Sequence, residues 1–201
     1  MNEARWQALV DHLRGTTYRF GLIMVDSPVH RIEFEAGLTD AEIAATEVRF
    51  GFRFPPDLRE FLQTALPCSP RFPNWRSAEE AELRGWLDAP REGVLFDVEC
   101  GFWWSAWGPR PDDHGHAVDL ARMELSALPP LIPVYGHRYL PSEPHRSGNP
   151  VFSVYQTDVI YYGADLEKYL AVEFGKQEFT REATESGVRV PFWTELAEAW
   201  D

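Results

Sequence analysis

Apolar residues recur at helical spacing through the first half of the chain and predict a series of helices. The clearest start is Thr39, which with Glu42 fits a capping box, where each side chain bonds the other residue's backbone N–H. The apolar stripe that follows ends at Gly51, so we predict a helix over residues 39–50. Further helices are predicted where similar spacing occurs: residues 2–14, 55–66, 77–87 and 116–128.

Runs rich in β-branched and aromatic residues predict strands. Three of these runs lie at residues 18–25, 94–98 and 131–135. Proline cannot donate a hydrogen bond to a neighbouring strand. Pro133 therefore indicates that residues 131–135 form an edge strand or contain a bulge.

A β-hairpin is the strongest expectation in the second half. Residues 151–155 and 159–162 are short β-rich runs with only Gln156, Thr157 and Asp158 between them. We expect Asp158 to take the left-handed turn position that glycine often occupies. Because both runs are apolar on both faces, we also expect the hairpin to lie centrally, covered by helices.

Two more helices are predicted after the hairpin, over residues 165–174 and 191–200. Helices first, then local strands, then helices again form an α+β pattern. We therefore expect one domain over residues 1–201, with a central antiparallel sheet of about four to six strands flanked by helices.

Charge narrows the classes of partner. The chain has 19 Lys and Arg against 32 Asp and Glu, a net charge of −13. This balance argues against binding to nucleic acid or to anionic lipid, because both need clustered positive charge. The start of the chain lacks an apolar signal-peptide core, and Cys68 and Cys100 are expected to be free, buried thiols. We expect a cytoplasmic protein that associates with no membrane.

Several segments resemble the SUKH superfamily, which includes the Smi/Knr-like regulators of fungal cell-wall assembly. The similarity covers most of residues 38–174, and its segments are Thr39–Arg76, Leu131–Pro141 and Gly148–Gly163. It implies an α+β fold with helices packed on an antiparallel sheet. It also implies a role that bacterial members often have, as immunity proteins that neutralise a cognate toxin. The superfamily has no agreed catalytic residues, so none is transferred to this chain.

Reactive groups give little support for catalysis. The nearest approach to a metal cluster is a short acidic and histidine-containing segment: Asp112, Asp113, His114, His116 and Asp119. Its spacing matches no defined zinc signature, and a solvated turn before a helix explains it better. We therefore predict no catalytic residue, metal or cofactor, and a hydrolase built on this segment is the third choice.

Aromatic and charged residues supply candidates for protein binding. Four tryptophans lie in predicted loops, where they either fill the core or act as exposed anchors, because tryptophan is enriched in binding hot spots. Arg138 either binds an anion or forms a buried ion pair. Asp158 either caps a turn or forms an acid–tyrosine pair with Tyr161 and Tyr162. The candidate partner-binding residues are Trp75, Trp103, Trp104, Trp107, Arg138, Tyr139 and Asp158.

These observations favour a noncatalytic protein-binding domain. The expected partner is a protein, for example a basic toxin domain such as a nuclease, since an acidic surface attracts a basic one. The function is then that of an immunity protein or a related regulatory adaptor. The alternative is a small-molecule or cell-wall-linked sensor, which a deep pocket lined by aromatic residues would favour.

Overall fold

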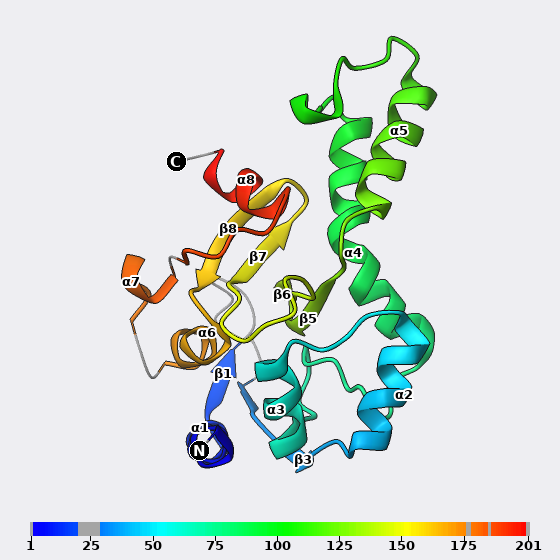
Figure 1. Cartoon of the computed structure of the whole chain (residues 1–201). Coiled ribbons are helices and arrows are strands. Elements are labelled where there is room, and N and C mark those ends of the chain that lie inside the picture. Colours follow the sequence, from blue (N-terminus) through cyan, green and yellow to red (C-terminus); the bar gives the residue numbers. More distant parts are fainter. Residues whose placement is uncertain (1, 20–28, 176–177, 185, 200–201) are drawn as a thin grey trace.

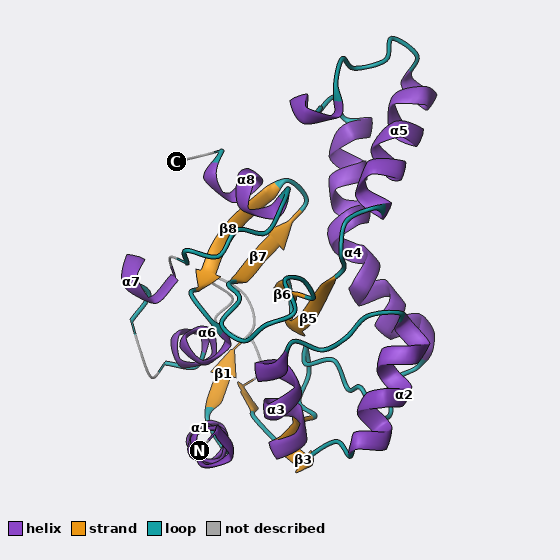
Figure 2. Cartoon of the chain, in the orientation of Figure 1, coloured by secondary structure: helices purple, strands orange, loops and turns teal. Residues whose placement is uncertain are grey.

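The computed structural model of the chain describes residues 2–19, 29–175, 178–184 and 186–199 (Figure 1). It has an α+β fold with a four-stranded antiparallel sheet and two small two-stranded sheets (Figure 2). The N-terminal part contains these elements in order: α1 (Asn2–Leu13), β1 (Thr17–Arg19), β2 (Val29–Arg31), β3 (Phe34–Ala36), α2 (Asp40–Phe50), α3 (Pro56–Thr64) and β4 (Ala65–Pro67).

The local signals in this part are confirmed. The Thr39 backbone N–H donates to Glu42 Oε2 at 2.8 Å, and the Glu42 N–H donates to Thr39 Oγ1 at 3.2 Å. Gly51 ends α2 with a φ of 72°, and α3 begins at Pro56. Of the strand predicted over 18–25, residues 18 and 19 belong to β1, and residues 20–25 lie outside the described part.

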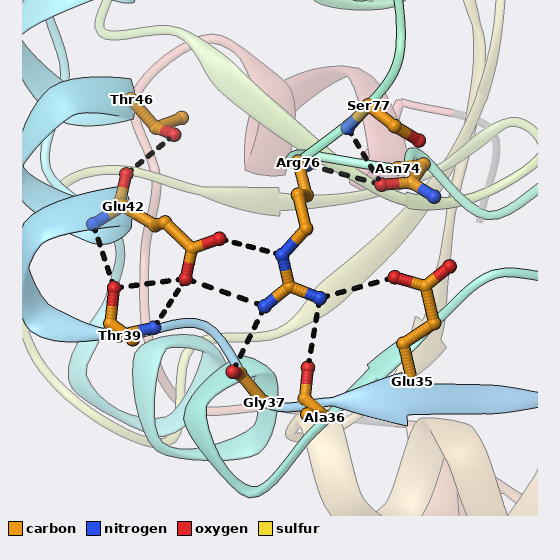
Figure 3. A network of polar contacts seen from close by, with 9 residues as sticks. All are labelled: Glu35, Ala36, Gly37, Thr39, Glu42, Thr46, Asn74, Arg76 and Ser77. Carbon is orange, nitrogen blue, oxygen red and sulfur yellow. Dashed lines mark hydrogen bonds and ion pairs between the residues drawn. The ribbon is translucent and has the colours of Figure 1, made fainter.

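Arg76 fixes the loop that leads out of this part (Figure 3). Its Nε donates to Glu42 Oε1 at 2.6 Å, and its Nη1 pairs with Glu35 at 3.1 Å. The same guanidinium donates to the carbonyl oxygens of Ala36 and Gly37, both at 3.1 Å. Hydrogen bonds from Arg76 and then from Thr39 lower the pKa of Glu42 to about 2. The capping box of α2 is therefore also the anchor of residues 74–77.

The middle of the chain corrects two predictions. The helix expected over 77–87 and the strand expected over 94–98 form a single 20-residue helix, α4 (Glu80–Glu99). Val94, Leu95 and Val98 continue the buried stripe that begins at Leu83 and Leu87. A short apolar run fits a strand or a buried helical segment equally well, and here its packing partners decide in favour of the helix.

Helix α5 (His114–Ser126) runs beside α4 and forms with it the helical hairpin at the upper right of Figure 1. Between them lies a loop with one 3-10 turn, η1 (Ser105–Trp107). α5 begins two residues earlier than predicted because Asp113 caps it, accepting a hydrogen bond from the His116 N–H at 2.8 Å. The far end of this hairpin carries Phe102, Trp103, Trp104 and Trp107, which pack against one of the core clusters.

The main sheet has the strand order β5 (Leu131–Tyr135), β6 (Arg138–Pro141), β7 (Val151–Tyr155), β8 (Asp158–Gly163). Pro133 predicted an edge strand or a bulge, and both are present: β5 is an edge strand, and its register with β6 shifts after Pro133. Alternate residues of the sheet face two different apolar clusters, with Ile132 and Leu140 in one and Leu131 and Tyr139 in the other.

The predicted hairpin forms, with two corrections. Gln156, with a φ of 58°, takes the left-handed position, whereas Asp158 pairs with Tyr155 in the ladder. The Gln156 backbone lies close to Gly93 of α4, where an added Cβ atom would come within 3.1 Å of the Gln156 Cα. The hairpin is also less central than expected, since β8 is an edge strand and Ile160 is 42% exposed.

The C-terminal part contains α6 (Leu166–Glu173), α7 (Arg181–Thr184) and α8 (Trp193–Glu198). Asp165 caps α6, as the prediction for 165–174 implies, while the helix predicted from 191 starts at Trp193. Both cysteines are free, but Cys68 is half-buried and Cys100 is exposed, so the expectation of buried thiols is wrong. Each helix among the described residues is too short or too polar to span a bilayer.

Candidate protein-binding surface

Trp75 belongs to the core. Only 6% of it is exposed, and its ring lies 5.2 Å from that of Phe54 and 5.9 Å from that of Phe52. The core-filling interpretation therefore holds for this tryptophan. Its ring offers almost no surface to a partner.

The other three candidate tryptophans gather at the far end of the α4–α5 hairpin. The rings of Trp103 and Trp107 are 5.3 Å apart, and Trp107 stacks on Phe192 at 5.8 Å with an interplanar angle of 12°. Trp104 meets the same phenylalanine at 5.7 Å. Each of these indoles is half-buried, so one part packs on the core and the other faces outward. We call residues 102–107 the aromatic end.

Contacts within the loop hold the aromatic end in place. The Trp103 indole N–H donates to the Gly108 carbonyl at 2.8 Å. Arg110 donates to the carbonyl oxygens of Gly101 at 2.8 Å and Val98 at 3.2 Å, which ties the loop to the last turn of α4. These contacts order the rings in the free chain, and ordered side chains lose less conformational entropy when a surface is bound.

Carboxylates flank the aromatic end in the chain. Glu99, Asp112 and Asp113 are exposed, and the described chain gives Glu99 and Asp112 no ion pair. Arg110 is the cation of this loop, and its guanidinium is engaged with backbone carbonyls. Exposed carboxylates therefore stand on both sides of the aromatic end in the sequence, while the guanidinium of Arg110 is occupied by the backbone.

The acidic and histidine-containing segment does not form a metal centre. Asp113 is the cap of α5, and His114 and His116 lie in the first turn of that helix. Among the residues that the structure describes, no group of three or more His, Cys, Asp or Glu side chains is placed to hold a metal ion. The hydrolase interpretation thus loses the cluster on which it depended.

Arg138 lies in a buried polar network, as the second of its two interpretations predicts. Its Nη1 donates to Ser153 Oγ at 3.0 Å, its Nε is 3.6 Å from Glu173 Oε2, and its Cζ lies 3.8 Å above the ring of Tyr162. Burial raises the pKa of Glu173, against the opposing effect of Arg138. Burial, together with the charges of Arg138 and Arg71, lowers the pKa of His137 to about 4.

The remaining two candidates differ in exposure. Asp158 is exposed at the end of the β7–β8 hairpin. Tyr139 is only 3% exposed, and burial raises its pKa to about 12. Its hydroxyl is therefore protonated at neutral pH and makes no hydrogen bond with the described part of the chain.

Tyr139 lines a shallow groove on α4 that sequence reasoning missed. The groove has a volume of about 400 Å³, and the other residues that line it are Ala81, Glu82, Gly85, Trp86 and Ala89. Its signal in the sequence is the placement of small residues at every fourth position, 81, 85 and 89, which share one face of a helix. We call this feature the α4 groove.

A hollow beside β8, α7 and α8 has a volume of about 690 Å³. Ile160, Phe179 and Arg181 are among its lining residues, and no tryptophan of the described chain lines it. The sensor interpretation expects a deep pocket lined by tryptophans. This hollow does not provide one.

Comparison with family models, curated proteins and solved structures gave no match for this chain.

Proposed function

We propose that the chain is a noncatalytic protein-binding domain that recognises a basic partner through the aromatic end. The observation that carries this proposal is the set of ordered, half-exposed indoles of Trp103, Trp104 and Trp107, with the exposed carboxylates of Glu99 and Asp112 close to them in the sequence. Tryptophan rings supply large apolar contact area, and carboxylates attract a positive partner and speed encounter.

The resemblance to the SUKH superfamily suggests which biological role such a binding surface serves, namely that of an immunity protein. An immunity protein occludes the active surface of a toxin, and a nuclease toxin is positively charged where it binds phosphate. The α+β fold, with helices packed on an antiparallel sheet, is compatible with that resemblance. A regulatory adaptor uses the same kind of surface on a different partner. The free thiols fit a reducing compartment such as the cytoplasm.

Charge reversal tests the proposal. The purified chain is titrated by calorimetry against each purified protein that the genes adjacent to its own encode, first as wild type and then as the Glu99→Lys, Asp112→Lys double variant. The control is Glu178→Lys, Glu182→Lys, which changes the net charge equally at exposed positions in a different part of the chain. We expect the first variant to bind at least about tenfold more weakly and the control to bind like wild type.

Two outcomes contradict the proposal. If no co-encoded protein binds, the immunity role fails. If both variants weaken binding equally, the attraction comes from net charge and not from the aromatic end.

A further inference from the structure

Three buried polar atoms between helix α6 and the main sheet have no hydrogen-bond partner. They are the Tyr169 hydroxyl, Glu173 Oε2 and Arg138 Nε, and each is shielded from bulk solvent. Within the described part of the chain, none of the three donates or accepts a hydrogen bond. Buried polar atoms in proteins are nearly always paired, so three unpaired atoms in one region require an explanation. We call these three residues the buried polar site.

The fold brings the three side chains together. Tyr169 and Glu173 are four residues apart in α6 and therefore share one face of that helix. Arg138 lies on β6, and its Nε is 3.6 Å from Glu173 Oε2. Tyr162 of β8 links the two sides, because its ring centre is 3.8 Å from Arg138 Cζ and 6.1 Å from the centre of the Tyr169 ring.

The protonation state of Tyr169 is defined by its surroundings. Burial raises the pKa of its hydroxyl well above the ordinary value, and the charges of Glu173 and then Arg138 also act on that pKa. The hydroxyl therefore keeps its proton at neutral pH and is within electrostatic reach of both charged groups. It is able to donate one hydrogen bond and to accept others.

Packing opposes direct closure of the site. A Cβ atom on Gly163 would lie 2.7 Å from the Tyr169 Cα, so α6 already approaches the sheet as closely as a glycine allows. Arg138 is held on the other side by its hydrogen bond to Ser153 Oγ at 3.0 Å. The 3.6 Å between Nε and Oε2 is too long for a hydrogen bond, but it is a separation that a water molecule can bridge.

The donors and acceptors of the site select a small neutral molecule. Arg138 Nε–H only donates, an ionised Glu173 oxygen only accepts, and the Tyr169 hydroxyl does both. An ion of either sign is repelled by one of the two opposite charges that lie so close together. A water molecule has the required combination of two donors and two acceptor lone pairs.

We propose that the buried polar site binds one ordered water molecule. The water accepts a hydrogen bond from Arg138 Nε, donates one to Glu173 Oε2 and forms a third with the Tyr169 hydroxyl. Buried waters in proteins typically make about three hydrogen bonds. This water completes the hydrogen bonding of the ion pair that joins α6 to β6, so that the pair tolerates burial. The site does not depend on the aromatic end, so this proposal and the preceding one fail independently.

Crystal structures of the full chain, at a resolution that shows individual water molecules, test the site. The wild type is compared with Tyr169→Phe, which removes one of the three partners. The control is Tyr162→Phe, which removes a neighbouring hydroxyl and keeps the ring above Arg138. We expect a water peak within about 2.6–3.2 Å of all three atoms in the wild type. The same peak is expected in Tyr162→Phe, and it is expected to weaken or disappear in Tyr169→Phe.

Magnetic relaxation dispersion of the water oxygen nucleus provides a second readout in solution, because it counts long-lived internal waters. We expect one such water fewer in Tyr169→Phe than in the wild type, and an unchanged count in Tyr162→Phe. A thermal melt verifies that both variants are folded. The wild-type density decides by itself whether the water is bound, so the proposal can be tested even if a variant does not fold.

Several results overturn the proposal. One is a wild-type structure in which the Tyr169 hydroxyl bonds directly to Glu173 or Arg138, or in which no density lies between the three atoms. Another is density that belongs to an ion or to a larger molecule. A peak and a water count that are unchanged in Tyr169→Phe, or that fall equally in Tyr162→Phe, also overturn it.

Discussion

Replacing Arg138 with methionine is expected to destabilise the protein strongly. The substitution keeps the bulk of the side chain but removes the ion pair with Glu173, the hydrogen bond to Ser153 and the cation above the Tyr162 ring. Removing one partner of a buried pair costs about 3–5 kcal/mol. Because the Nε–Oε2 distance is 3.6 Å and the Glu173 side chain is 19% exposed, we expect a loss of about 3 kcal/mol, the lower end of that range.

The pH dependence of this loss has a defined sign. Burial raises the pKa of Glu173 in the folded state, and loss of Arg138 raises it further. The folded variant then holds a proton that the unfolded chain releases, so its stability falls as pH rises from the unfolded pKa to the folded one. The destabilisation is therefore smaller near pH 5 than near pH 8. Loss of Arg138 also relieves the lowered pKa of His137, which acts in the same direction.

Urea unfolding at both pH values measures the effect. At neutral pH, a loss of about 3 kcal/mol corresponds to a melting temperature lower by about 6–12 °C for a chain of this size. Adding Glu173→Gln removes the unpaired charge and is expected to recover at least about half of the loss. A single variant that loses less than about 1 kcal/mol, or a double variant no more stable than the single one, refutes the reasoning.

Two further predictions concern local packing and the Arg76 network. A Cβ atom on Gly93 would lie 3.1 Å from the Gln156 Cα, so Gly93→Ala is expected to lower the free energy of unfolding by about 1–3 kcal/mol. A Cβ atom on Gly85 meets open space, so Gly85→Ala is expected to raise it by up to about 1 kcal/mol. Equal melting temperatures for the two variants contradict this prediction. Because Arg76 lowers the pKa of Glu42 to about 2, the stability that this contact provides is present above the unfolded pKa and is lost as pH falls toward 2. Arg76→Ala should therefore show a shallower loss of stability across that interval in acid titrations followed by circular dichroism, and an unchanged slope refutes the assignment.

Local chemistry explains which elements the sequence predicts correctly. Thr39 and Glu42 specify the start of α2 through contacts three residues apart, and Pro133 carries a constraint that an edge strand or bulge must satisfy. The run at 94–98 has no such local constraint. Its helical state depends on contacts that α4 makes with the sheet and α5, which are distant in sequence.

The candidate surface also combines features that the sequence predicts with features that depend on contacts between residues distant in the chain. The sequence identifies Trp103, Trp104 and Trp107 as aromatic candidates, but their half-buried state depends on Phe192, far along the chain. The α4 groove needs Tyr139 of β6 beside α4, a long-range juxtaposition that spacing alone does not reveal. Exposure and grooves are tertiary properties, whereas caps and turns are local.

Amide hydrogen exchange on the chain, with and without a protein that is encoded by an adjacent gene and binds it, tests most directly whether the aromatic end is the docking surface. The expected result is slower exchange across residues 99–113 in the complex, with exchange in the main sheet unchanged. Slower exchange confined to other parts of the chain, or the same exchange with and without that protein, contradicts the assignment.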